Sequence, residues 1–551
     1  MERSCRQCQA VFDITDTDRA LYVRLQVPEP TICSVCSERL RFSFRNERHF
    51  YKRKSDLSGK DIVTIYAPDT PYKVYHREEW FSDAYDPLTY GRDVDFQRPF
   101  FDQLYDLSLA VPYEHMVIMN SVNCDYCNFI VNSKNCYMSM RIDAEDVSYC
   151  YLVFGKSKDC IDCHTINACE LCYECIDCVN SYASCSCQRC RQCSDCAFCI
   201  DCIGCHHCFG CVGLRQKEYH FFNRPYSKEE YERAVRAEYQ TQTHTGARKA
   251  WEALQALDLT LPHRPAIIDQ SESVSGDYIV RSKNVQRSFD VEQCEDAIDC
   301  AGIEYSKDVA RSCFLYYGEL CYEQVSCIPS HSIQFSYGAY DSHDIEYCMM
   351  AHNGSHHCFG SIGLKHNAYV VLNKQYTQEE YGHVRDRLVE HMKQTGEYGH
   401  FFPPKLVHFA YNETVAQEFH PLTKEEALTL GYRWRDVLDE PQAASNTLDG
   451  SELPDNIEDV SDDILQVAIR CAKSGRFFRI TKKELDFYRA HKIPLPHLHP
   501  DERHYHRMSL RNPRKLWKRT CVKCGKDIQT TYAPDRPEIV YCEECYLASV
   551  Y

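Results

Sequence analysis

The sequence contains no long apolar stretch. No run of about 18 or more apolar residues occurs in its 551 residues, so we expect no transmembrane helix. The opening residues, MERSCRQCQA, lack the apolar core and small-residue cleavage site of a secretory signal peptide. We therefore expect a cytoplasmic protein. Because thiols stay reduced there, we expect its 36 cysteines to pack, bind metal or do redox chemistry rather than form a disulfide scaffold.

Sequence signatures of catalysis are also missing. The chain has no Ser-His-Asp order, phosphate-binding loop or dinucleotide fingerprint. We therefore expect a non-catalytic protein. A β-helix enzyme that acts on a polymer, with Asp159 and Asp162 as acid and base, is only the third hypothesis.

The two ends of the chain lack the negative charge that dominates its middle. The net charge is −17, yet residues 1–60 hold 12 Lys/Arg against 8 Asp/Glu, and residues 470–551 hold 18 against 9. An acidic middle repels nucleic acid, whereas basic ends attract it. The alternative interpretation is that both basic stretches are ordinary solvated surfaces.

Each end also carries two CxxC pairs. Such pairs bring four thiolates around one ion, and closed four-cysteine sites are typical of structural Zn²⁺. We predict two zinc sites, formed by Cys5, Cys8, Cys33 and Cys36 and by Cys521, Cys524, Cys542 and Cys545.

The two ends are diverged copies of one module. They align without a gap at a shift of 466 residues, so that Tyr66-Ala67-Pro68-Asp69 matches Tyr532-Ala533-Pro534-Asp535. The alignment gives every module two metal positions, of which one is kept. The second position of the N-terminal copy reads Ser55, Ser58, His76 and Glu79, and the first position of the C-terminal copy reads Cys471, Ser474, His499 and Glu502. We predict that both of these have lost their metal; the alternative is that Cys471, His499 and Glu502 still hold a weakly bound ion.

Both modules have a basic stretch between their two metal positions. Cations for phosphate and aromatic rings for stacking suit RNA or single-stranded nucleic acid. We predict the contacting residues to be Arg39, Arg41, Arg45, Arg48, Lys52, Arg53, Arg507, Arg511, Arg514, Lys515, Trp517, Lys518 and Arg519.

The middle of the chain repeats with a short period. Cysteines recur at every third residue from Cys187 to Cys211, and small residues fill the same columns in a second half of the repeat. Both halves end alike, in HHCFGCVGL from His206 and HHCFGSIGL from His356, and both are followed by a helix capping box at Ser227 or Thr377. We expect the paired histidines to be features of the terminal coils rather than ligands. A fixed period with one small residue per side predicts a β-solenoid with coils of about 12 residues; a coil of about 24 is the alternative.

The solenoid cysteines allow two interpretations. The second half fills the same columns mostly with Ser, Val, Ile and Ala, which favours cysteine as a small packing residue. Two coils hold only cysteine, and four thiols facing one axis could instead bind a soft metal ion or an iron–sulfur cluster. This possible additional thiolate site comprises Cys169, Cys172, Cys175, Cys178, Cys193, Cys196, Cys199 and Cys202.

The predicted fold is mainly β, a duplicated cysteine-lined β-solenoid flanked by two homologous zinc-ribbon modules and joined by a few α-helices. Residues 61–115 are aromatic and acidic and are expected to cover the first coil. The predicted units are an N-terminal zinc-ribbon module (1–80), an aromatic cap (81–120), the first β-solenoid (121–226), a helical spacer (227–269), the second β-solenoid (270–376), a helix and aromatic packing segment (377–439), a flexible acidic linker (440–463) and a C-terminal zinc-ribbon module (464–551).

Several long motifs carry a resemblance to a protein family. They include RNERHFYKRK from Arg45, YGRDVDFQRPFFDQ from Tyr90, FAYNETVAQEFHPLTKEEA from Phe409, LRNPRKLWKR from Leu510 and TTYAPDRPEIVYCEECY from Thr530. The chain resembles large, uncharacterised, cysteine-rich zinc-ribbon proteins of genome-reduced uncultured bacteria over nearly its whole length. The resemblance implies the architecture and no activity.

Three functions follow from these patterns. The first is a zinc-binding scaffold that binds RNA, a ribonucleoprotein or a protein partner through its basic modules. We expect no membrane partner. The second is storage or sensing of a soft metal by the solenoid thiols, and the third is the polymer-acting enzyme.

Overall fold

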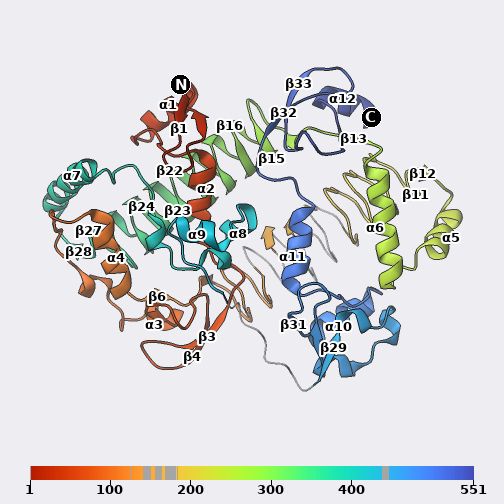
Figure 1. Cartoon of the computed structure of the whole chain (residues 1–551), viewed down its shortest axis with the longest axis horizontal. Coiled ribbons are helices and arrows are strands. Elements are labelled where there is room, and N and C mark those ends of the chain that lie inside the picture. Colours follow the sequence, from red (N-terminus) through yellow and green to blue (C-terminus); the bar gives the residue numbers. More distant parts are fainter. Residues whose placement is uncertain are drawn as a thin grey trace.

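The computed structural model describes residues 2–124, 126–139, 151–154, 164–167, 182, 184–436 and 446–550. The protein is mainly β: two β-solenoid halves form its centre, and helices and short hairpins from both ends of the chain surround them (Figure 1). Within the described ranges, no helix is long and apolar enough to cross a membrane.

The second solenoid forms one 15-stranded sheet that winds around a common core. Most of its parallel partners lie twelve positions apart, as in Ile279↔Val291 and Val291↔Ile303, whereas β14 and β15 are offset by eleven and β24 and β26 by thirteen. Its strands are β14 (Ile268–Asp269), β15 (Gly276–Val280), β16 (Lys283–Gln286), β17 (Ser288–Glu292), β18 (Glu295–Ile298), β19 (Ala301–Glu304), β20 (Lys307–Ala310), β21 (Cys313–Tyr316), β22 (Gly318–Tyr322), β23 (Val325–Gln334), β24 (Tyr337–Glu346), β25 (Met349–His352), β26 (His356–Phe359), β27 (Ala368–Val371) and β28 (Lys374–Gln375).

Left-handed residues make the corners of the solenoid. Asn284, Arg287 and Asp290 have φ values of 54°, 48° and 55°, and each is followed by a residue that points into the core. A left-handed non-glycine residue costs roughly 1–2 kcal/mol, so the stacked coils must offset that cost through their backbone hydrogen bonds. Small side chains such as Val285 and Ser288 fill the narrow interior.

The first solenoid has the same construction in its described part. Isolated parallel bridges join Cys185 to Ala197 and Gln188 to Ile200, and the cysteines from Cys187 to Cys211 are all buried. Its strands are β7 (Ile118–Met119), β8 (Ile130–Val131), β9 (Tyr151–Phe154), β10 (His164–Asn167), β11 (His220–Phe221) and β12 (Arg224–Pro225). Much of the predicted repeat between residues 140 and 181 lies outside the described residues.

The N-terminal region packs against both solenoids. It comprises β1 (Glu2–Ser4), β2 (Val11–Asp13), α1 (Asp16–Arg24), α2 (Ser34–Phe42), β3 (Tyr51–Lys54), β4 (Asp61–Thr64), β5 (Val74–Tyr75), α3 (Arg77–Phe81), η1 (Pro87–Tyr90), α4 (Phe100–Ala110) and β6 (Tyr113–Glu114). Residues 61–115, expected to cover the first coil of the first solenoid, lie against the last coils of the second. Tyr85 donates a hydrogen bond to the Gly363 carbonyl at 3.0 Å, and the ring centres of Phe100 and Phe359 lie 5.6 Å apart.

Helices follow each solenoid half. The predicted capping boxes are confirmed: the Ser227 and Thr377 side chains accept hydrogen bonds from the Glu230 and Glu380 amides. These segments are α5 (Lys228–Glu238), α6 (His244–Asp258) and β13 (Pro262–His263) after the first half, and α7 (Gln378–Thr395), η2 (Pro404–Leu406), η3 (Tyr411–Glu413), α8 (Val415–Phe419) and α9 (Lys424–Thr429) after the second.

The C-terminal region begins earlier than the acidic composition indicated. Residues 446–463, expected to belong to a flexible linker, place Leu453 and Ile457 in a core with Ile469 and Tyr488. The region comprises β29 (Thr447–Asp449), η4 (Gly450–Glu452), η5 (Ile457–Asp459), η6 (Asp462–Gln466), β30 (Ala468–Arg470), β31 (Phe477–Phe478), α10 (Lys482–Ala490), α11 (Pro500–Ser509), β32 (Trp517–Thr520), β33 (Asp527–Thr530), β34 (Ile539–Val540) and α12 (Glu543–Val550).

Candidate metal centres

The N-terminal centre joins a hairpin turn to a helix start. Cys5 and Cys8 lie in the turn between β1 and β2, and Cys33 and Cys36 lie at the start of α2. The four sulfur atoms all lie within 4.8 Å of one another, and the Cys8 and Cys33 Sγ atoms are 3.8 Å apart. The neighbouring Cys36 thiol lowers the pKa of Cys33 to about 5, although burial opposes the shift.

The C-terminal centre has the same construction. Cys521 and Cys524 lie in the turn between β32 and β33, and Cys542 and Cys545 lie at the start of α12. The four sulfur atoms again lie within 4.8 Å of one another, with Cys524 and Cys542 Sγ 3.7 Å apart. Burial raises the pKa of Cys521, but backbone hydrogen bonds from Cys542, Cys524 and Lys523 outweigh it and lower the pKa to about 6.

These distances fit a tetrahedral metal ion. With a Zn–S bond of about 2.3 Å, the sulfur atoms of a regular tetrahedron lie about 3.8 Å apart. The measured separations of 3.8 and 3.7 Å match that edge. Both predicted four-cysteine groups can therefore hold one metal ion each.

The four hairpin turns of the two modules have one geometry. In the C-terminal turn, the Cys521 amide donates to the Lys526 carbonyl at 2.8 Å, and Gly525 has a φ of 75°. In the turn at Ser55, the same bond runs to Lys60 at 2.8 Å and Gly59 has a φ of 73°. The turns at Cys5 and Cys471 repeat it, with φ values of 62° at Gln9 and 72° at Gly475. The backbone has thus kept all four turns, although only two of them carry paired cysteines.

The two remaining positions are occupied by polar contacts among the protein's own residues. The Ser55 hydroxyl donates to the Glu79 carboxylate, which also accepts from the His76 amide at 3.1 Å. In the C-terminal copy, Glu502 pairs with Lys473 at 2.9 Å, and the Cys471 sulfur accepts from the Ser474 amide at 3.4 Å. Neither position brings three His, Cys, Asp or Glu ligand atoms within 4.8 Å of one another.

The solenoid thiols make hydrogen bonds to the backbone. Cys199 Sγ donates to the Ala197 carbonyl at 3.4 Å and to the Cys208 carbonyl at 3.6 Å. Ser184 Oγ makes the equivalent bond to Tyr182 at 3.1 Å, so cysteine and serine serve alike in these columns. Of the predicted thiolate site, Cys193, Cys196, Cys199 and Cys202 are buried and do not all converge within 4.8 Å, whereas Cys169, Cys172, Cys175 and Cys178 lie outside the described residues, as do Asp159 and Asp162.

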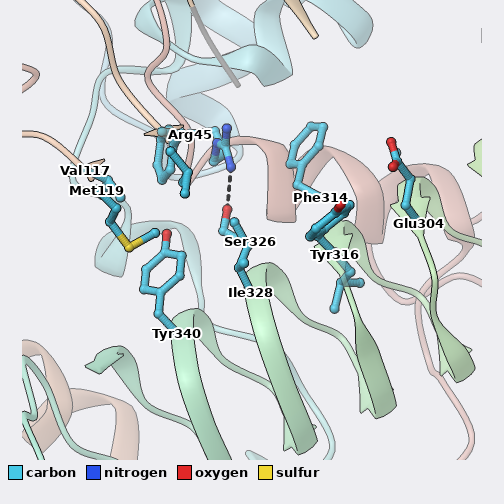
Figure 2. A pocket seen from close by; sticks show the side chains of 13 residues that line it. Arg45, Val117, Met119, Glu304, Phe314, Tyr316, Ser326, Ile328 and Tyr340 are labelled. Atoms are coloured by element: carbon cyan, nitrogen blue, oxygen red, sulfur yellow. Dashed lines mark hydrogen bonds between the residues drawn. The ribbon is translucent and has the colours of Figure 1, made fainter. Parts of the chain in front are cut away.

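Several arginines predicted to bind nucleic acid are buried inside the protein. Arg41 pairs with Glu323 at 2.8 Å, and both side chains are at most 5% exposed. Arg45 lies with its guanidinium carbon 3.5 Å from the Phe129 ring centre and 4.7 Å from that of Phe314. Figure 2 shows its hydrogen bond to Ser326 at the edge of a cavity of about 40 Å³.

Arginines of the C-terminal module and Arg48 are also paired with acids of the protein. Asp290 accepts hydrogen bonds from Arg511 at 2.5 Å and from Arg514 at 2.8 Å. Arg48 pairs with Asp501 of the other module at 2.6 Å, and Arg507 is 4% exposed. The side chains of Arg511 and Arg514 are each 7% exposed and that of Arg48 is 8% exposed, so these guanidinium groups are largely engaged by acids of the protein itself.

The remaining cations of the predicted set lie nearer the surface. Lys52, Lys515 and Lys518 are exposed, and the ammonium nitrogen of Lys515 lies 5.1 Å from the Trp517 ring centre. Arg39, Arg53 and Arg519 are half-buried: Arg39 donates to Cys36 Sγ at 3.6 Å, Arg53 pairs with Asp56 at 2.9 Å, and Arg519 donates to the Glu538 carbonyl at 3.3 Å.

The acidic partners of these arginines were missed in the sequence. Each acid lies far along the chain from the arginine with which it pairs: Glu323 from Arg41, Asp290 from Arg514 and Asp501 from Arg48. No local motif marks these acids. Burial raises the pKa of Glu323, but Arg311 and Arg41 hold it below its ordinary value. The only available signal was the opposite charge of the ends and the middle.

The chain was compared with protein-family models, curated proteins and solved structures. No family model, no curated protein and no solved structure matches the chain.

Proposed function

We propose that the protein is a non-catalytic zinc-binding scaffold, in which two zinc-ribbon modules cap and join two solenoids of twelve-residue coils. One observation carries the proposal: each module pairs with the strand that leads into one solenoid. In the N-terminal module β5 pairs with β6 through Val74↔Tyr113, just before the first solenoid. In the C-terminal module β34 pairs with β13 through Ile539↔Pro262, just before the second.

The modules also connect the two solenoids to each other. The Asn46 carbonyl of the N-terminal module accepts from Asn128 of the first solenoid at 2.9 Å, while Arg41 reaches Glu323 of the second. In the C-terminal module, the Tyr546 hydroxyl accepts from Arg215 of the first solenoid at 3.0 Å. Thr531 of that module donates to Asp277 of the second at 2.9 Å. Solenoid ends need such caps, because an uncovered edge exposes unpaired backbone groups.

Zinc is the metal that this proposal assigns to the four-cysteine centres. Four thiolates without an open position suit a structural ion, which contributes directly to folding of the module around it. The ion would hold a hairpin turn to a helix start, and β34 lies immediately before that helix start in the C-terminal module. Loss of the ion should therefore release β34 from β13.

Hydrogen–deuterium exchange can test this link. The double substitution Cys521→Ser and Cys524→Ser should speed exchange in β34 and β13 and leave β5 and β6 protected. Cys471→Ser is the matched control, because Cys471 occupies a turn of the same geometry without a four-cysteine group, and it should change neither pair. Unchanged protection of β13 in the double variant would contradict the capping role.

RNA or ribonucleoprotein binding is the second part of the proposal. It is supported by residues 515–518 and the turn of the β32–β33 hairpin, which expose Lys515, Lys518, Lys523 and Lys526. The Lys515 ammonium nitrogen lies 5.1 Å from the Trp517 ring centre. Changing Lys515 and Lys518 to Glu should weaken RNA binding and reduce its salt dependence, with a slope of about 0.7 lost per single-strand phosphate contact. Filter binding at several salt concentrations measures this, and Lys52→Glu probes the equivalent position of the other module. If the wild-type protein shows no salt-dependent affinity for RNA, the modules are better interpreted as protein-docking ends.

Soft-metal storage remains a prediction with less support. The described solenoid thiols already donate to backbone carbonyls, and serine replaces them in equivalent columns. Both observations support packing as their role.

A further inference from the structure

The last coils of the second solenoid carry a histidine cluster on their outer surface. Parallel pairing places His331, His343 and His356 one above another, on successive coils. The rings of His343 and His356 stack with centres 4.9 Å apart. His357 follows His356, and Asp344 follows His343, so that one His–His pair and one His–Asp pair share one patch.

Asp344 lies between two imidazoles. Its Oδ2 atom is 2.9 Å from His343 Nδ1 and 3.8 Å from His357 Nδ1. Ligand atoms of a small tetrahedral site lie roughly 3–3.5 Å apart, so both separations are close to those of a metal-binding group. Among the residues that the structure describes, no lysine or arginine forms an ion pair with Asp344. Burial raises the pKa of Asp344, but His343, Ser332 and His357 hold it below the ordinary value.

We propose that His343, His357 and Asp344 bind a divalent transition-metal ion of the zinc, cobalt or nickel type. Two imidazole nitrogens and one carboxylate oxygen suit such ions, and a surface position leaves the remaining coordination places to water. The three ligand atoms do not yet all lie within 4.8 Å, so an imidazole must rotate on binding. The side chains of His343, His357 and Asp344 are 48%, 39% and 40% exposed, which leaves room for that rotation.

The first solenoid offers a built-in comparison. The bridge Ser194↔His206 corresponds to His343↔His356, so Asp195 and His207 stand where Asp344 and His357 stand. His207 stacks on Tyr219 at 5.2 Å, as His357 stacks on Tyr369 at 5.2 Å. Only the third ligand differs: Ser194 replaces His343, and its hydroxyl lies 2.7 Å from His206 Nδ1. The first solenoid should therefore lack the site.

Cobalt titration of the zinc-loaded full chain tests the proposal. One Co²⁺ per chain should bind with weak visible d–d bands and without thiolate-to-cobalt charge transfer. His343→Ser, which copies the first solenoid, and Asp344→Asn should each weaken binding at least about tenfold. His207→Ala should change nothing, and Ser194→His should add a second cobalt ion.

Two results would overturn the proposal. One is equal cobalt affinity in the wild-type and His343→Ser proteins. The other is a spectrum dominated by thiolate charge transfer, which would place the ion in a four-cysteine centre instead. Circular dichroism of each variant verifies that the fold is kept, and the gain expected from Ser194→His does not depend on any loss of stability.

Discussion

Replacing Asp290 by Asn should loosen the C-terminal basic segment from the second solenoid. Asp290 is a corner residue of β17, and its side chain is 13% exposed. It accepts from Arg511 at 2.5 Å and from Arg514 at 2.8 and 3.1 Å. Asparagine keeps the shape of the side chain and removes its charge. The guanidinium groups of Arg511 and Arg514 then lose the negative charge with which they pair.

The structure gives the size of this effect. Breaking a buried ion pair costs about 3–5 kcal/mol, because an uncompensated charge stays buried. Two contacts remain in the variant: the ion pair of Arg514 with Glu38 at 3.7 Å, and the cation–π contact of Arg511 with the Tyr278 ring centre at 4.2 Å. They offset part of the lost stabilisation. We expect the free energy of local opening to fall by about 2–4 kcal/mol. Amide exchange that requires this opening should then be roughly 30- to 700-fold faster.

Hydrogen–deuterium exchange of α11 and β32 measures this change. Asp195→Asn is the matched control, because Asp195 is an exposed corner residue of the first solenoid with a φ of 52°. Similar exchange rates in α11 for wild type and Asp290→Asn would refute the docking argument.

The same carboxylate sets a pH dependence. Burial opposes ionisation of Asp290, but Arg511 and Arg514 hold its pKa well below the ordinary value. Its contribution to stability is therefore complete above the unfolded-state pKa of about 3.9, and it is lost as the pH falls from there toward the folded-state pKa. The Asp290→Asn protein should lose this part of the acid sensitivity.

Further predictions concern the solenoid core and the turns. Cys199→Ser should keep the fold and cost about 1–2 kcal/mol in urea unfolding, because serine can donate to the same carbonyl; loss of a bound metal from this variant would instead support the thiolate store. Changing Ser55, Ser58, His76 and Glu79 together to Cys should create a third zinc site, since that turn has kept the geometry of the turns that carry the four-cysteine groups. Zinc content per chain measures this outcome, and an unchanged content would show that the turn geometry does not suffice.

Local sequence patterns predicted the parts of the molecule but not their assembly. The CxxC spacing predicted the two four-cysteine groups. Each group needs only a hairpin turn and a helix start, and each of these is formed by a short segment of chain. The Ser227 and Thr377 boxes predicted helix starts for the same reason. By contrast, the pairing of β34 with β13 joins residues 539 and 262, and no local pattern encodes such a contact.

The basic stretches show what composition leaves undetermined about the site. A run of arginines looks the same in sequence whether it faces solvent or a buried acid. Arg41 and Arg514 belong to the second kind, because Glu323 and Asp290 come from distant coils of the solenoid. Lys515 and Lys518 belong to the first kind. Lysine is the more strongly hydrated cation, whereas arginine suits buried pairs, so the division between the two residue types has a physical basis.

The most direct test of the scaffold account is the zinc content of protein purified without oxygen and desalted in a weak chelator. The account predicts two tightly bound zinc ions per chain, one for each four-cysteine group, and one ion after Cys521→Ser and Cys524→Ser. Wild-type protein without zinc, or a double variant that keeps the wild-type content, would contradict it.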